Sequence, residues 1–400
     1  MLDQTKRGSI IEIVVSILAL LILLNYFAML IGYNEFVIKL IFSLYICVIL
    51  VFFVYKPLNF FHLKITLIIL MIIVLGNPTH FWDAWAIWLF HAKRIFFEQS
   101  ITAQLDGYAK WSHNDYPVIA PAFAASLATL VGGWNNIFPK LAFLLMYFPP
   151  LILSIKIFNV RYHLLLLILI LYILNLQFIL GLADGLVAIY FTLSSYLIYD
   201  IFVNKQNSFF CLLITFCFLI ILSLLKNEGI VLYVILLGTI SLINFSKIKF
   251  LQNYKKIIFL FFSVIPILAW KIICFKNSVN SDIINYEAIN ALSNRIFDYK
   301  SFKLIFKFII IDTKLLIFSI IFILMAFYFT KNKKVNYFSL SIGTTYLFFL
   351  IIIYLIIPYD LSWSLETTIT RVTMPLALSF SFFGLLQIYY KKEKYPYLKK

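Results

Sequence analysis

Polar and aromatic residues gather between positions 76 and 121 of this otherwise apolar chain, in a stretch that carries three His and four Trp. Within it, Asp83 stands between Trp82 and Trp85. A carboxylate that aromatic side chains partly remove from water can have a raised pKa, and it can then accept a proton from a hydroxyl group. Asp83 is therefore the candidate general base. The alternative is that Asp83 only caps a helix that begins there.

The same stretch could hold a divalent metal ion. Its histidines are His80, His91 and His113. They could assist Asp83, or could bind a metal together with Asp115, although no pair has the close spacing of a typical metal site. Asp115 and Tyr116 precede Pro117, which favours an extended chain before it. The alternative is that Asn114 and Asp115 simply form a turn.

Charged residues also interrupt the apolar runs later in the chain. Asp184 stands between two of these runs, and Lys226 and Glu228 lie between two others. A charge placed at the middle of a membrane costs roughly 2.5–3.5 kcal/mol, so such residues often have a function. The simpler alternatives are that Asp184 caps the following helix and that Lys226 and Glu228 form an ion pair.

Two of the cations are candidates for holding a phosphate group. Lys226 is one, and Arg371, which precedes the last apolar run, is the other. The planar guanidinium of arginine can bind a phosphate through two parallel hydrogen bonds. The alternative for Arg371 is an arginine at a helix end, whose charged head extends to the membrane surface.

The composition of the chain indicates a membrane protein rather than a soluble one. Of the 400 residues, 63% are hydrophobic and 12% are charged, whereas soluble proteins have about 25% charged residues. The net charge of +16 does not indicate nucleic-acid binding, because the Lys and Arg residues form short clusters between apolar runs rather than one continuous basic face. The four Cys residues lie in or beside apolar runs, and we interpret them as small buried hydrophobic residues.

We predict an all-α polytopic membrane protein of about 12 transmembrane helices, forming a single transmembrane domain over residues 1–400. The predicted helices are 9–32, 36–54, 60–76, 137–156, 163–181, 185–202, 209–225, 229–246, 257–275, 303–330, 336–357 and 372–390. The apolar stretch 118–131 is short and contains Pro121. If it crossed the membrane, every later basic cluster would lie outside, against the positive-inside rule. We therefore predict that it is a re-entrant or interfacial helix.

This topology places both termini in the cytoplasm of a bacterial cell and the protein in its inner membrane. Three loops then face outward: a large loop at 77–135, a second at 276–302 and a third at 358–371. The first loop is expected to carry an amphipathic helix over 83–98 on the membrane surface. Its apolar face would include Trp85, Trp88, Ala92 and Phe96, with His91, Lys93 and Arg94 off that face. The basic end of the chain, 391–400, could contact anionic membrane lipid.

Five short motifs, in their order along the chain, resemble the GT-C class of integral-membrane glycosyltransferases. The likeness is greatest to the bacterial proteins grouped with protein O-mannosyltransferases and aminoarabinose transferases. The motifs are Trp82-Asp83-Ala-Trp85-Ala-Ile-Trp88 with Ala92-Lys93, His113-Asn-Asp115-Tyr116-Pro117-Val-Ile-Ala-Pro121, Leu182-Ala-Asp184-Gly-Leu, Leu225-Lys226-Asn227-Glu228-Gly229, and Leu361-Ser-Trp363 through Thr367 to Arg371 and Pro375. Together they span about three quarters of the chain.

The resemblance implies a sugar donor linked to polyprenyl phosphate, and a glycan, lipid or protein acceptor on the outer face of the membrane. It also implies inversion at the sugar carbon. In such enzymes an acidic residue of the first large outer loop is the catalytic base, which corresponds to Asp83 here. Outward-facing Lys and Arg residues hold the donor phosphate, which implies that role for Lys226 and Arg371.

Two other classes of protein fit the same apolar chain. A transporter or flippase of a lipid-linked saccharide would carry charges at mid-helix depth and internal repeats, whereas the charges here lie at helix ends and no repeat is evident. A non-catalytic membrane protein of envelope assembly would tolerate replacement of Asp83, Lys226 and Arg371. We predict the glycosyltransferase.

Overall fold

The protein is described here by a computed structural model. It describes residues 2–55, 60–79, 81–105, 112–158, 160–206, 208–245, 247–279, 281, 286–330 and 333–394. These residues form helices joined by short connections, with no strand among them. The predicted all-α fold is therefore confirmed.

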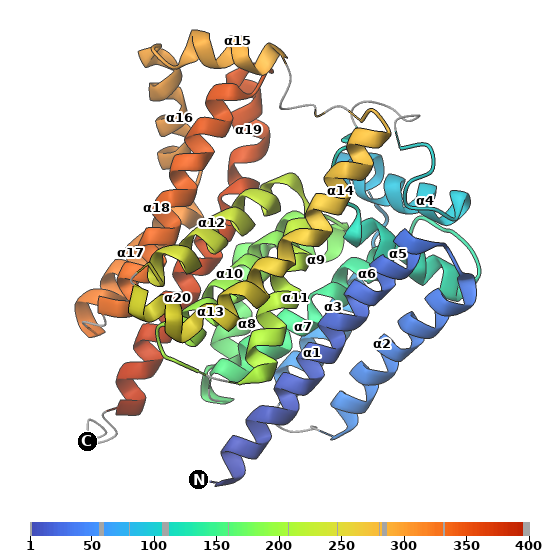
Figure 1. Cartoon of the computed structure of the whole chain (residues 1–400), viewed down its shortest axis with the longest axis horizontal. Helices are drawn as coiled ribbons and strands as arrows, with labels where there is room; N and C mark the ends of the chain where they lie inside the picture. The colour runs from blue at the N-terminus through green and yellow to red at the C-terminus, as the bar shows by residue number, and fades with distance from the viewer. Residues whose placement is uncertain are drawn as a thin grey trace.

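The α-helices differ widely in length, from the 4 residues of α9 to the 30 residues of α1, and the helices pack into one bundle (Figure 1). They are α1 (Leu2–Ile31), α2 (Glu35–Tyr55), α3 (Phe61–Gly76), η1 (Ala84–Trp88), α4 (Leu89–Glu98), α5 (Ile119–Val131), α6 (Pro139–Met146), α7 (Phe148–Ile157), α8 (Val160–Leu174), α9 (Gln177–Leu180), α10 (Asp184–Phe202), α11 (Phe209–Leu225), α12 (Asn227–Ile243), α13 (Lys247–Phe261), η3 (Phe262–Val264), α14 (Ile265–Lys276), α15 (Tyr286–Arg295), α16 (Tyr299–Ile311), α17 (Lys314–Thr330), α18 (Lys333–Ile356), α19 (Leu361–Val372) and α20 (Met374–Lys394).

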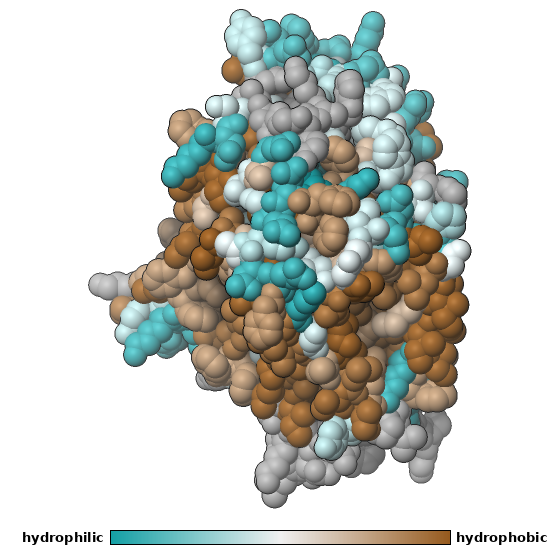
Figure 2. All heavy atoms as spheres, turned by 90° about the vertical axis from the view of Figure 1, so that its right-hand side faces the viewer, coloured by the Kyte–Doolittle hydropathy of each residue, from teal (hydrophilic) through white to brown (hydrophobic). Residues whose placement is uncertain are grey.

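Seven helical segments in the described part of the chain are long and apolar enough to cross a membrane, or eight if the bent pair α16 and α17 counts as one span. Five further apolar helices are shorter, among them α11 and α12 with 17 residues each. Figure 2 shows a broad hydrophobic surface below a more hydrophilic upper end. These features indicate a membrane protein, and the count of twelve spans stays a prediction.

The two ends of the bundle differ. Helix α1 begins and α20 ends at the lower end of Figure 1, whereas α15 and the end of α14 lie at the upper end. Arg295 of α15 fastens the beginning of α19 to this upper end, because its guanidinium donates hydrogen bonds to the carbonyl oxygens of Ile357 (2.7 Å) and Tyr359 (2.8 Å). At the lower end, Lys391 donates to the carbonyl of Phe329.

Helix α10 is the centre of the bundle. All but one of its 19 residues are buried, and it packs against α11, α12 and α20. Helix α5, which contains Pro121, is also buried, and it packs against α1, α2, α4 and α6. The surroundings of this helix are therefore other helices of the protein, and its re-entrant or interfacial position in the membrane stays a prediction.

The predicted helix 303–330 is wrong, because residues 299–330 form two helices, α16 and α17, that meet at an angle of 70°. Thr313 lies in the break between the two helices. Its side-chain hydroxyl donates a hydrogen bond to the carbonyl oxygen of Ile309, four residues earlier. Helix α16 also carries lysines at positions 300, 303 and 307. This spacing puts the charges on one helix face, which favours an amphipathic surface helix over a spanning one.

Three smaller expectations also change. Most of the predicted outer loop 358–371 is helical, because the carboxylate of Asp360 accepts a hydrogen bond from the backbone N–H of Trp363 (2.8 Å) and caps α19. His91 and Arg94 were expected off the apolar face of 83–98, yet both are buried. Cys47 is exposed, whereas the other three Cys residues are buried as expected.

Close approach of α11 to α12 requires a glycine at position 229. A Cβ atom there would lie 2.2 Å from the carbonyl oxygen of Leu222, whereas a Cβ at Gly238 on the same helix would meet nothing within 4 Å. Gly229→Ala should therefore destabilise the detergent-solubilised protein by about 1–3 kcal/mol through overpacking. Gly238→Ala should stabilise it by roughly 0.5–1 kcal/mol, because alanine loses less entropy in a helix. Equal unfolding free energies for the two variants would contradict this packing.

Candidate active site

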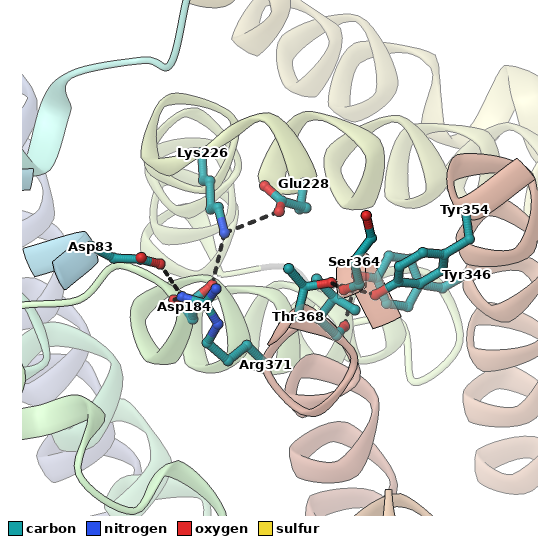
Figure 3. A network of polar contacts seen from close by, with 10 residues as sticks. Asp83, Asp184, Lys226, Glu228, Tyr346, Tyr354, Ser364, Thr368 and Arg371 are labelled. Carbon is teal, nitrogen blue, oxygen red and sulfur yellow. Dashed lines mark hydrogen bonds and ion pairs between the residues drawn. The ribbon is translucent and has the colours of Figure 1, made fainter. Parts of the chain in front are cut away.

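The site is a cluster of five charged side chains that the helix ends bring together. It contains three carboxylates, those of Asp83, Asp184 and Glu228, and two cations, those of Lys226 and Arg371. Figure 3 shows Asp83 approaching from one side, with Lys226 and Arg371 on either side of Asp184. All five residues were candidates from the sequence, and the structure joins them into one network.

Asp184 holds the centre of this network. It is the first residue of α10, after a break in which Gly181 adopts a left-handed conformation (φ 73°). Ala183 occupies the capping position, so the alternative that Asp184 only caps the helix does not hold. The side chain of Asp184 is 5% exposed. Its Oδ1 lies 2.9 Å from the ammonium of Lys226, and its Oδ2 lies 3.8 Å from the guanidinium of Arg371.

Lys226 is the single residue between α11 and α12, and its backbone is extended. Since the chain leaves helical geometry there, the Lys226 side chain points away from both helix surfaces and into the cluster (Figure 3). Its ammonium bridges Asp184 (2.9 Å) and Glu228 (3.0 Å). The predicted ion pair of Lys226 with Glu228 is present, but it is part of the larger network rather than a separate pair.

Arg371 belongs to the last turn of α19, and it joins the stretch before η1 to the bundle. Its Nη1 contacts Oδ2 of Asp83, which lies 288 residues earlier in the chain. The side chain is 19% exposed, so it does not extend to the membrane surface as the alternative from the sequence proposed.

Asp83 directly precedes η1, a turn of π-helix over residues 84–88. Its side chain makes no capping hydrogen bond, so the capping alternative is excluded. Trp82 and Trp85 do not enclose it: they are 47% and 54% exposed and pack edge to face with ring centres 6.4 Å apart. The neighbour of Asp83 is therefore the cation of Arg371 rather than an aromatic shell. Single π-helical turns often occur at functional sites.

The turn at 113–116 covers the Lys226 side of the cluster. The ring of Tyr116 lies 5.8 Å from the Lys226 ammonium, and His113 stacks on Tyr116 with ring centres 4.6 Å apart. A cation over an aromatic face is attracted to it. Burial, followed by the nearby carboxylate of Glu228, raises the pKa of Tyr116 well above its usual value, so this phenol stays protonated at neutral pH.

Asp115 anchors that turn. Its Oδ2 accepts a hydrogen bond from Asn227 (2.8 Å), and its backbone carbonyl accepts one from the indole of Trp270 (3.1 Å). In the part of the chain that the structure describes, no group of three or more His, Cys, Asp or Glu side chains could hold a metal ion. His80, one of the possible metal ligands, lies outside the described residues. The pairing of Asp115 with His113 at a metal therefore gains no support.

Two supporting residues were missed from the sequence. Lys140 is 1% exposed and donates to the carbonyl of Asn77, at the C-terminal end of α3, where a cation offsets the helix dipole. It thereby fixes the start of the stretch that leads to Asp83. A lysine next to Pro139 in an apolar run was the available signal. Asn227, between the two predicted residues Lys226 and Glu228, links the cluster to Asp115 and Lys271.

The space inside the cluster is small. A cavity of about 10 Å³ is bounded by every charged residue of the cluster except Asp83. Tyr346, Val372 and Pro375 also line it. This volume holds about one water molecule. Two carboxylate oxygens of the cluster, Oδ2 of Asp184 and Oε2 of Glu228, have no hydrogen-bond donor among the described residues. A phosphate or a sugar therefore requires the cluster to open.

No protein-family model matches this chain, no curated protein does, and no solved structure does. A functional conclusion must therefore come from the chemistry of the cluster itself.

Removing Lys226 should be far more costly than its single charge suggests. Lys226→Met leaves three carboxylates with one cation in a mostly buried cluster, and loss of one partner of such a network costs about 3–5 kcal/mol. Adding Asp184→Asn should recover part of this loss. Unfolding free energies in mixed detergent micelles measure both effects, with Lys307→Met on α16 as an exposed-lysine control. Losses that simply add would show that the two residues are not coupled.

His91 should make the stability of the folded protein depend on pH. Burial, followed by the nearby cation of Arg94, lowers the pKa of His91 to about 4, and its Nε2 bonds to the carbonyl of Ser112 (2.7 Å). Between pH 6.5 and 4 the unfolded chain binds a proton that the folded chain does not. Stability should therefore fall by about 3 kcal/mol as the pH drops through this window.

The matched variants are His91→Gln, which keeps a donor for Ser112 but does not titrate, and His62→Gln, which removes an exposed histidine. Unfolding at pH 7 and pH 4.5 should show a smaller pH dependence for His91→Gln only. An unchanged dependence in that variant would assign the effect to other groups.

Proposed function

We propose that this protein is a glycosyltransferase of the bacterial inner membrane, which moves a sugar from a polyprenyl-phosphate donor to an acceptor hydroxyl. The observation that carries the proposal is the contact between Asp83 and Arg371 within one cluster. A carboxylate that can accept a proton and two cations that can bind a phosphate lie within reach of one another. The transfer reaction requires these two kinds of group side by side.

The step is a single displacement at the anomeric carbon of the donor sugar. The acceptor oxygen forms a bond to that carbon while the bond from the carbon to the phosphate oxygen breaks. Asp83 takes the proton of the acceptor hydroxyl, and polyprenyl phosphate leaves with the electron pair of the broken bond. One displacement inverts the configuration at the sugar carbon, and the cluster offers no separate nucleophile for a second one.

The two cations act on the leaving group. Negative charge grows on the phosphate as its bond to the sugar breaks, and fixed cations stabilise that charge in the transition state. Lys226 and Arg371 are held by the carboxylates of Asp184 and Glu228, so little reorganisation is needed when the charge develops. The motifs that resemble GT-C glycosyltransferases contain all of these residues, which adds to the proposal.

The position of the cluster suits a donor with a long lipid tail. Its residues stand at the beginnings of α10 and α12 and near the junction of α19 with α20, that is, at helix ends in an apolar bundle. A phosphate at such a depth can meet cations while its prenyl chain stays in the hydrocarbon. In this proposal the cluster faces the outer side, both termini are cytoplasmic, and the acceptor is a glycan, a lipid or a protein.

Asp83→Asn should abolish most transfer, because asparagine has nearly the same shape but cannot take the proton. Loss of a general base lowers rates by roughly 10²–10⁴-fold. The measurement is transfer of radiolabelled sugar from a pool of polyprenyl-phosphate donors in membranes that carry the wild type or the variant.

Glu366→Gln is the matched control, since it removes an exposed carboxylate from α19 and should leave transfer unchanged. Equal transfer by the wild type and Asp83→Asn would remove Asp83 from the role of base. A wild-type protein that transfers nothing from any donor would instead favour a transporter of lipid-linked saccharides.

A further inference from the structure

Arg371 has two carboxylate partners, and they differ in how firmly they are held. Asp184 is the first residue of the buried helix α10, its side chain is 5% exposed, and it also binds Lys226 at 2.9 Å. Asp83 lies before the π-helical turn η1, its side chain is 23% exposed, and Arg371 is its one ion-pair partner among the described residues. Arg371 hydrogen-bonds to Asp83, whereas Asp184 lies 3.8 Å from the guanidinium and is held by Lys226. Asp83 is therefore the partner that can move away from Arg371 without disturbing the ion pair of Lys226.

The charges in the cluster leave no free cation for a phosphate. Three carboxylates face two cations, and the cavity between them holds about one water molecule. A phosphate brought into this arrangement would meet net negative charge. It can bind only where a carboxylate moves away from a cation. Of the two carboxylates that contact Arg371, Asp83 is the more exposed, with 23% of its side chain accessible against 5% for Asp184.

The same contact occupies the oxygen of Asp83 that a base would use. Oδ2 of Asp83 accepts a hydrogen bond from the guanidinium of Arg371, so it cannot at the same time accept one from an acceptor hydroxyl. In the structure as it stands, the general base and the phosphate-binding arginine thus neutralise each other.

We infer that the phosphate of the lipid-linked donor replaces the Asp83 carboxylate on Arg371, so that donor binding itself releases the base. This inference rests on the proposed glycosyltransferase function. The exchange trades one anion for another on the same guanidinium, and the freed Asp83 stays next to the sugar carbon that will react. Donor then binds before the acceptor is activated, and Asp83 competes with the donor phosphate for Arg371.

Competition has a consequence that is unusual for a catalytic residue: removing it should tighten binding. Asp83→Asn should bind polyprenyl phosphate about tenfold more tightly than the wild type, since close charge pairs at binding sites commonly contribute at least that factor. Asp83→Glu keeps the competing charge and should stay within a few-fold of the wild type. The same Asp83→Asn protein should show a lower donor KM together with its lower kcat.

The experiment measures binding of radiolabelled polyprenyl phosphate to the full-length protein in nanodiscs of phosphatidylcholine. Polyprenol, which has the same tail without the phosphate, tests whether the gain requires the anion. Glu366→Gln removes a negative charge from α19 at an exposed position, and it tests whether any lost carboxylate would have the same effect.

Tighter binding of polyprenyl phosphate by Asp83→Asn alone, with no change for polyprenol, supports the exchange. Unchanged or weaker binding by Asp83→Asn overturns it, even if the wild type transfers sugar normally. An equal gain in Glu366→Gln also overturns it, because the effect would then be a general one of charge. Failure of the wild type to bind polyprenyl phosphate and to transfer sugar would remove the proposed function as well.

Discussion

The pairing of Arg371 with Asp83 and Asp184 is the constraint on which the described site depends. Charged side chains in an apolar bundle are costly unless each one meets an opposite charge. Here the carboxylates of α10 and of the stretch before η1 meet the guanidinium of α19. The network therefore decides how three distant parts of the chain must dock, whatever reaction it later supports.

The structure around the network is built to keep these charges in place. Lys226 reaches the cluster because one extended residue separates α11 from α12, and Gly229 lets the two helices approach closely enough. Tyr116 lies against the Lys226 ammonium, and the turn that carries it is tied down through Asp115, Asn227 and Trp270. Each of these supports acts on the position of a cation rather than on a substrate directly.

The sequence predicted which residues belong to the cluster better than it predicted which of them contact one another. A charged residue between apolar runs is easy to recognise, because a charge in a membrane is energetically unfavourable. Lys226, Asp184 and Glu228 could therefore be found without a structure. The contact of Asp83 with Arg371 spans 288 residues, and no local pattern encodes such a distance. For the same reason the sequence could not decide between a cap and a base at Asp83, because the missing capping bond is visible only in three dimensions.

Local patterns also failed where tertiary contacts override them. His91 and Arg94 have polar side chains on an amphipathic helix, and a surface position is the natural expectation. They are buried because the chain after α4 folds back and offers carbonyl oxygens at Ser112, Ile101 and Ala103. The break in 299–330 has a similar origin, since hydropathy alone does not distinguish one long span from a surface helix joined to a shorter one.

Stability and catalysis make opposite demands on the same ion pairs. A cluster in which every cation meets a carboxylate is the one that can form in an apolar bundle. In that cluster, however, Arg371 is occupied by Asp83 rather than by a phosphate, and Oδ2 of Asp83 is occupied by Arg371 rather than by an acceptor hydroxyl. A site of this kind becomes active only if its substrate brings the charge that takes over one of the pairs. The partial exposure of Asp83, against the burial of Asp184, places the more accessible of the two carboxylates at the edge of the cluster. The folded protein can then open its site there without exposing the charges on which the bundle depends.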